Sequence, residues 1–147
     1  MAKRLLLVDD CPQITKLLTI IVERYFSDSI IFETAYSLKQ AERCLEHMMP
    51  DIVLLDYRLQ PYDDCRETLP ALRRAGYAGP VHVWSTLDRS LLMAAKDCAD
   101  AASTICKIDF QGLRLKSMIE GIMASQPSPI SAFAKKQSDG DCRSAFA

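Results

Sequence analysis

The sequence predicts an α/β fold in which a doubly wound parallel sheet lies between two layers of helices. Short, continuous apolar runs alternate along the chain with longer segments whose apolar residues follow helical spacing. Apolar runs of this length are typical of strands that are buried on both faces, as the strands of a parallel sheet are. Polar residues follow several of these runs directly, and the carboxyl ends of the strands are where open α/β folds place their sites.

Five strands are expected from the apolar runs. The clearest is the run that ends in Asp56, and the weakest is the short run before Lys107. Pro, Gly, Ser or charged residues separate the runs from their neighbours, as expected where strands end. In chain order the expected strands cover residues 4–8, 30–35, 51–56, 81–85 and 103–107.

Helices are expected between these strands. The segment after the first strand has apolar residues at i, i+3, i+4 and i+7, and Pro12 suits its first turn. Ser37 and Gln40 have capping-box spacing at the start of the second helix, and Pro50 ends that helix.

The sequence signals for the later helices are weaker than those for the first two. Because Pro70 interrupts its segment, we expect the third helix to begin near Thr68, with Pro70 in its first turn. A fourth helix is expected over 88–99, and Asp109 is a candidate N-cap for the last one.

Five βα units imply parallel strands joined by right-handed crossovers. From about Ser125 onward the composition changes to Ser, Pro, Ala, Lys and Asp. Such a composition lacks the apolar periodicity that a docked element needs. We therefore expect one folded domain over 1–124 and a disordered tail over 125–147.

Composition and charge narrow the classes of partner. The chain has 147 residues, of which 49% are hydrophobic, and a formal net charge of -1. This charge gives no basic footprint for nucleic acid, and no apolar segment has membrane-spanning length. The six cysteines show no Cys-x-x-Cys spacing, so we expect neither a zinc site nor a redox pair but reduced thiols and a cytoplasmic location.

The residues at the strand ends can support phosphoryl chemistry. Asp9 and Asp10 follow the first strand, Asp56 the third and Lys107 the fifth. Carboxylates are hard ligands that suit Mg²⁺, and Asp56 can attack phosphorus as a nucleophile. Lys107 would neutralise charge on the phosphoryl oxygens, and a hydroxyl from Ser85 (or its neighbour Thr86) would donate a hydrogen bond to them.

With this set, the chain resembles the receiver domain of two-component response regulators, over roughly residues 3–124. The resemblance implies a flavodoxin-like fold with strand order 2-1-3-4-5 and helices on both faces. The motifs that carry it are LLLVDD at 5–10, PDIVLLDYRL at 50–59, PVHVWS at 80–85 and Lys107.

The resemblance also assigns roles. Asp56 matches the phosphoacceptor, Ser85 (or Thr86) the hydroxyl and Lys107 the lysine that bind the phosphoryl group. Asp9, Asp10 and Asp56 match the Mg²⁺ ligands, together with the backbone carbonyl of Arg58. The implied donor is a histidine kinase or a histidine phosphotransfer protein, and the implied output is contact with a downstream protein target.

Three positions depart from the pattern of that family. Ile108 follows Lys107 where the family usually has proline, and Thr86 stands where alanine or glycine is usual. Thr104 stands where an aromatic switch residue is common. The usual coupling between a hydroxyl and a ring is therefore not expected in its ordinary form.

The leading interpretation is a single-domain response regulator that catalyses only its own phosphorylation and dephosphorylation. A second is a pseudo-receiver, which would have the same fold and act as an interaction module without phosphorylation. An aspartyl-phosphate phosphatase ranks below both, because position 58 is Arg where that chemistry wants a second acid. A nucleotide-binding module lacks its Gly-rich phosphate loop.

Overall fold

A computed structural model describes residues 2–62, 64–85, 101–107 and 113–125, and the account below concerns these residues. The predicted five-stranded parallel sheet is confirmed, with the order β2-β1-β3-β4-β5. The strands are β1 (Lys3–Val8), β2 (Ile30–Ala35), β3 (Ile52–Asp56), β4 (Val81–Ser85) and β5 (Ser103–Cys106). Each agrees with its predicted range to within one residue at either end.

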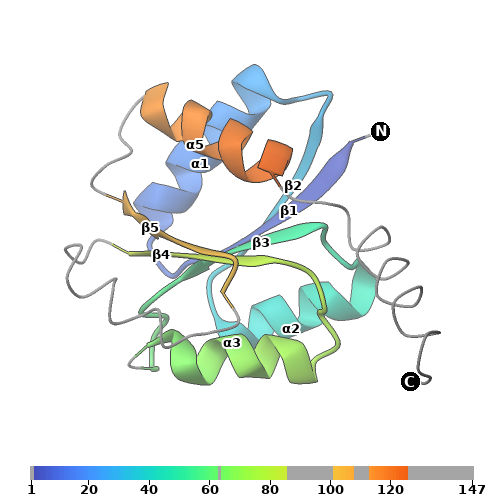
Figure 1. The fold of residues 1–147 in the computed structure, drawn as a ribbon, viewed down its shortest axis with the longest axis vertical. Coiled ribbons are helices and arrows are strands. Elements are labelled where there is room, and N and C mark those ends of the chain that lie inside the picture. The colour runs from blue at the N-terminus through green and yellow to red at the C-terminus, as the bar shows by residue number, and fades with distance from the viewer. Residues whose placement is uncertain (1, 63, 86–100, 108–112, 126–147) are drawn as a thin grey trace, which may run out of the picture.

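Among the described residues, four helices cover the two faces of the sheet, as Figure 1 shows. They are α1 (Pro12–Tyr25), α2 (Leu38–His47), α3 (Cys65–Arg74) and α5 (Leu113–Ser125). Helices α1 and α5 lie together on one face, whereas α2 and α3 lie together on the other. The result is the three-layer sandwich that the alternating pattern predicts.

Alternation along the strands divides the core into two clusters. On β1, Leu5 and Leu7 pack with the α1/α5 side, whereas Leu6 and Val8 pack with the α2/α3 side. All residues of β3 and β4 are buried. Because successive side chains point to opposite faces, both helical layers are needed to bury these continuous apolar runs.

The predicted start of the third helix is wrong. Helix α3 begins at Cys65, and Pro70 stands inside it rather than in its first turn. The Asp64 carboxylate accepts a hydrogen bond of 2.8 Å from the backbone N–H of Arg66 and also binds the guanidinium of Arg66. This N-cap fixes the start of the helix several residues before the proline.

Several predictions fall outside the described residues: the helix over 88–99, the cap at Asp109, the hydroxyl of Thr86 and the tail beyond Ser125. Within the described ranges, no helix combines the length and apolar character needed to cross a membrane. Cys11, Cys44 and Cys106 form no disulfide, whereas Cys65 is disulfide-bonded, which differs from the expectation of reduced thiols.

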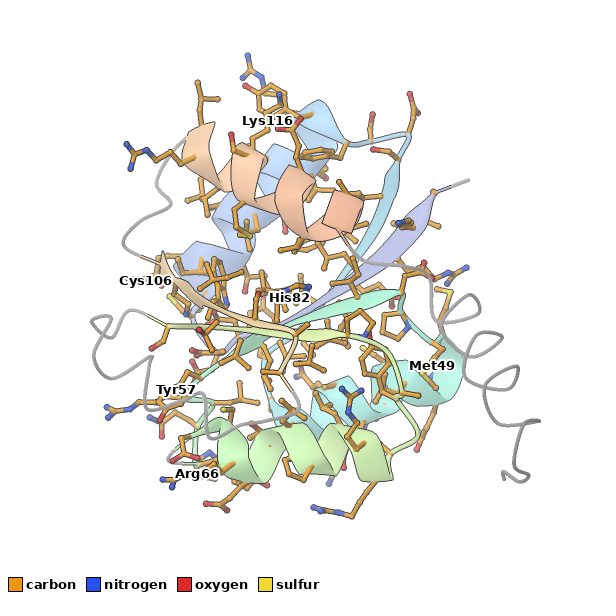
Figure 2. The ribbon with its side chains drawn as sticks, in the orientation of Figure 1. Met49, Tyr57, Arg66, His82, Cys106 and Lys116 are labelled. Carbon is orange, nitrogen blue, oxygen red and sulfur yellow. The ribbon has the colours of Figure 1, made fainter. Side chains whose placement is uncertain are left out.

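His82 is a buried polar residue on β4, labelled in Figure 2. Its Nδ1 is hydrogen-bonded to the hydroxyl of Ser103, and its Nε2 has no partner among the described residues. Burial lowers the pKa of His82 below its ordinary value, because the charged imidazolium is poorly solvated there. The native state therefore holds this ring neutral.

We predict that stability falls as the pH drops below about 6.5, since the unfolded chain then binds a proton at His82 that the native state excludes. His82→Gln should lessen this loss, measured as the free energy of unfolding between about pH 7 and pH 5.5. His47, the other histidine, is exposed, so His47→Gln should leave the pH dependence unchanged. Equal pH dependence in the two variants would contradict the prediction.

Candidate functional site

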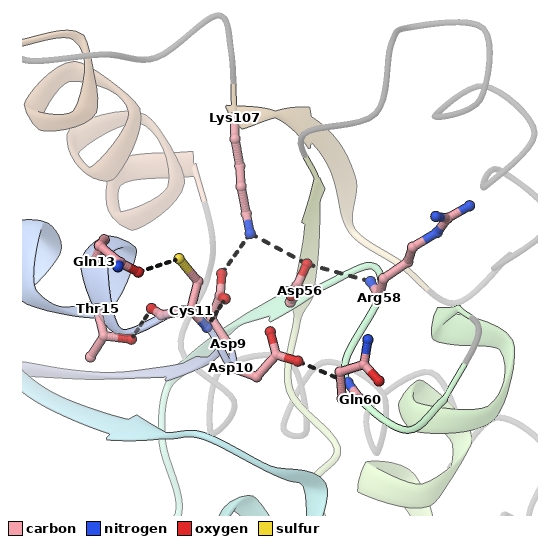
Figure 3. Close-up of polar contacts among 9 residues, drawn as sticks. All are labelled: Asp9, Asp10, Cys11, Gln13, Thr15, Asp56, Arg58, Gln60 and Lys107. Atoms are coloured by element: carbon pink, nitrogen blue, oxygen red, sulfur yellow. Dashed lines mark hydrogen bonds and ion pairs between the residues drawn. The ribbon is translucent and has the colours of Figure 1, made fainter.

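The carboxyl ends of the strands bring the predicted residues to one edge of the sheet. Register pairs Val8 with Leu55, Asp56 with Trp84, and Ser85 with Cys106. The residues that end or follow these strands therefore lie side by side, although more than twenty positions separate each pair in the chain. Figure 3 shows three carboxylates and one ammonium gathered there.

The three carboxylates form a tight cluster. One oxygen from each of Asp9, Asp10 and Asp56 lies within 4.8 Å of the others. Asp9 is fully buried, Asp56 is 7% exposed and Asp10 is half-buried. The cluster therefore opens toward solvent on the side of Asp10.

Lys107 supplies the positive charge of the site. Its Nζ lies 2.7 Å from Oδ2 of Asp9 and 3.3 Å from Oδ1 of Asp56. The lysine side chain is only 7% exposed. A buried ammonium this close to two carboxylates is held by charge-assisted hydrogen bonds, which are stronger than neutral ones.

Backbone N–H groups orient each carboxylate (Figure 3). Asp9 accepts a bond of 2.9 Å from the N–H of Cys11, and Asp56 accepts a long bond of 3.4 Å from that of Arg58. Asp10 accepts a bond of 3.0 Å from the N–H of Gln60. The start of α1 and the loop after β3 therefore position the acidic groups.

Burial dominates the electrostatics of Asp56. Its pKa is raised to about 7, first because burial removes water from the carboxylate. The attraction of Lys107 lowers the pKa, and the weaker repulsion from Asp9 raises it. The buried lysine therefore outweighs the repulsion from Asp9 but does not offset the loss of hydration.

This donor set fits a divalent cation. Three carboxylate oxygens in close reach are hard ligands, and the positive charge of an ion would stabilise the ionised form of Asp56 that burial disfavours. The arrangement can thus pair an ionised nucleophile with two sources of positive charge.

The other predicted residues have simpler positions. Ser85 is buried at the end of β4, directly after the residue that pairs with Asp56. The backbone N–H of Arg58 donates a hydrogen bond to Asp56. The role of the Arg58 carbonyl as a cation ligand stays a prediction. Thr104 is half-buried on β5 opposite Val83, so the described part of β5 carries no aromatic ring.

Two contacts of the site were missed from the sequence. Gln60 holds Asp10 through its backbone, which no side-chain motif reveals. The ring of Trp84 lies with its centroid 5.0 Å from Nζ of Lys107, a contact that the sequence did not predict. Its position one residue before Ser85, in register with Asp56, was the signal that could have indicated it.

Comparison with known proteins supports the fold. No protein-family model matches the sequence, and no curated protein matches it. Among solved structures, a two-component response regulator of the LuxR family from Aurantimonas sp. SI85-9A1 matches with a TM-score of 0.67 and 24% identity. That match covers 94% of this chain and 99% of the other.

A second similar structure is the signal receiver domain of a putative Luxo repressor protein from Vibrio parahaemolyticus. Its TM-score is 0.64 at 17% identity, over 82% of this chain and 88% of that one. The N-terminal domain of a response regulator/sensory box/GGDEF protein from Carboxydothermus hydrogenoformans also has a TM-score of 0.64, at 20% identity, over 83% and 93% of the two chains. The chain therefore has the receiver-domain fold.

The burial of these charged groups predicts opposite effects of two substitutions in the presence of a chelator. Because the raised pKa of Asp56 makes its ionised form unfavourable above about pH 7, Asp56→Asn should raise the free energy of unfolding at pH 8 by about 1 kcal/mol or more. The gain should shrink toward pH 5, where native Asp56 is protonated. Lys107→Met should instead cost about 3 kcal/mol at pH 8, because it leaves buried carboxylates unpaired.

Thermal and urea unfolding measure both effects. Asp28→Asn and Lys39→Met make the same chemical changes at exposed positions and should alter stability by less than about 0.5 kcal/mol. Destabilisation by Asp56→Asn at pH 8 would show that burial does not penalise the ionised carboxylate of Asp56.

Proposed function

We propose that this chain is a response-regulator receiver that accepts a phosphoryl group on Asp56 from a phosphohistidine of a histidine kinase or a phosphotransfer protein. One observation carries the proposal: the buried ammonium of Lys107 lies between Asp9 and Asp56 in a cluster of three carboxylates. The receiver fold supports it, because the cluster stands at the carboxyl edge where such sheets place their sites.

Asp56 is the nucleophile in this proposal. One of its carboxylate oxygens attacks phosphorus, and a P–O bond forms as the P–N bond to the donor histidine breaks. The leaving nitrogen keeps the electron pair of that bond and takes up a proton. The product is an acyl phosphate on Asp56.

Lys107 and Ser85 stabilise the charge that spreads over the phosphoryl oxygens. The ammonium, already beside Asp56, needs little movement to reach one of those oxygens, and the Ser85 hydroxyl would donate to another. Asp9, Asp10, Asp56 and the carbonyl of Arg58 would hold Mg²⁺, which supplies additional positive charge to the transferring group.

Output is proposed to come from changed protein contacts. A phosphoryl group adds negative charge at the sheet edge and biases a two-state element toward one arrangement. The proposal assigns this receiver to residues 1–124 and places it in the cytoplasm, with a downstream protein as its target.

A pseudo-receiver remains the second candidate, and Thr104 favours it. This residue is a half-buried threonine where the receiver family commonly has an aromatic switch. A module without that ring can still bind partners through its surface in a single state. The two candidates differ in whether Asp56 gains a phosphoryl group.

The first prediction concerns the cation. Mg²⁺ should raise the melting temperature of the native chain, because binding to the folded state alone stabilises it. Asp10→Asn should weaken this response at least about tenfold in Mg²⁺ concentration, since it removes a charged ligand. The fluorescence of Trp84, the only tryptophan, gives a second readout. An unchanged response in the Asp9→Asn/Asp10→Asn double variant would remove the acid pair from the cation site.

The second prediction tests the phosphoacceptor. Incubation with Mg²⁺ and acetyl phosphate should add one phosphoryl mass to the intact protein, and Asp56→Asn should abolish the gain. The exposed variant Asp28→Asn is the matched control and should label at the native rate. Equal labelling of Asp56→Asn would reject the assignment, and no labelling of the native chain by acetyl phosphate or a phosphorylated histidine kinase would favour the pseudo-receiver.

A further inference from the structure

Lys107 has an aromatic partner as well as its two carboxylates. The Trp84 ring centroid lies 5.0 Å from the Lys107 Nζ, within the range of cation–π attraction. Trp84 is fully buried and Lys107 nearly so. Attraction between a cation and a ring is strongest where both are shielded from water, as they are here.

The sheet places this ring beside the nucleophile. Trp84 on β4 is the register partner of Asp56 on β3, and register partners direct their side chains to the same face of a sheet. Trp84 packs in the cluster on the α1/α5 side. The ammonium of Lys107 therefore meets the carboxylate and the ring from one position.

Packing alone does not explain a tryptophan here. The indole N–H is buried and has no hydrogen-bond partner among the described residues, which carries a desolvation cost. Leucine or phenylalanine would fill apolar space without that cost. What tryptophan adds over leucine is the electron-rich face that attracts a cation.

A neutral partner also suits this site electrostatically. A further carboxylate could hold the lysine, but it would repel both the other acids and an incoming phosphoryl group. The ring attracts the ammonium without adding negative charge. Because this attraction is less directional than a hydrogen bond, the ammonium can turn from the carboxylates toward a phosphoryl oxygen while keeping the ring as a partner.

We propose that Trp84 is a positioning residue for phosphoryl transfer, whose indole face holds the ammonium of Lys107 beside Asp56. The inference rests on the proposed function and deepens it. Trp84 touches none of the reacting atoms in this scheme and acts only through Lys107.

The strongest test weakens the electronic character of the ring and keeps its shape. Because Trp84 is the only tryptophan, growth on fluorinated tryptophans changes this ring alone. The rate of phosphorylation by acetyl phosphate should fall stepwise from tryptophan through its mono-, di- and trifluoro forms, since each fluorine weakens the cation–π attraction. Trp84→Leu should slow the reaction about tenfold, and Trp84→Phe, which keeps a weaker ring, about threefold.

A second measurement needs no phosphorylation. The methylene protons next to Nζ of Lys107 should show an upfield ring-current shift in NMR spectra, reduced in Trp84→Phe and lost in Trp84→Leu. In a Lys107→Met background, fluorination should have no further effect on the residual rate, because the interacting partner is gone.

The outcomes separate the two claims. If the native chain is phosphorylated and its rate does not change with fluorination, the positioning role is overturned while the proposed function stands. If the Lys107 protons show no ring-current shift, the contact itself is refuted. If the native chain accepts no phosphoryl group from any donor, the proposed function fails and the positioning role fails with it.

Discussion

The ion pair between Lys107 and the two buried aspartates is the interaction on which the site depends. Three strands must end at the same level for the ammonium to lie 2.7 Å from Asp9 and 3.3 Å from Asp56. Burying these charges is costly, and buried ion pairs are weak sources of stability. The buried charges at this edge therefore lower the stability of the fold, and the burial of the continuous apolar strands offsets this loss.

The parallel register explains how residues that are far apart in the sequence meet at one edge of the sheet. The ends of β1, β3, β4 and β5 bring the reactive side chains to the edge, and the sheet sets their relative heights. Backbone N–H groups then fix the direction of the carboxylates. Because these donors belong to the main chain, the orientation of the acids depends on the path of two loops more than on the side chains in them.

Most of the fold could be predicted from the sequence because its strands are buried on both faces. Runs such as Ile52–Leu55 have no polar residue to obscure the pattern. The acids and Lys107 could be predicted because they follow those runs directly. The start of α3 could not be predicted, because Pro70 is a strong signal for a first helical turn. The cap that fixes the start is Asp64, whose carboxylate binds the backbone and side chain of Arg66.

The remaining misses have a common cause. The hold of Gln60 on Asp10 is made by a backbone N–H, and any residue except proline can supply one. The contact of the Trp84 ring could not be predicted, because an apolar run does not indicate which charged group faces a ring within it. Its contact with Lys107 exists only once β4 and β5 are adjacent.

The hydrogen bond between Asp10 and Gln60 links the loop after β3 to the acidic cluster. One oxygen of Asp10 holds the main chain of this loop, and the same carboxylate belongs to the cluster that fits a cation. One side chain therefore serves both the acidic cluster and the loop that leads to α3. The position of that loop is tied to a group that would meet an arriving ion, so the path of the main chain and the geometry of the cluster depend on each other.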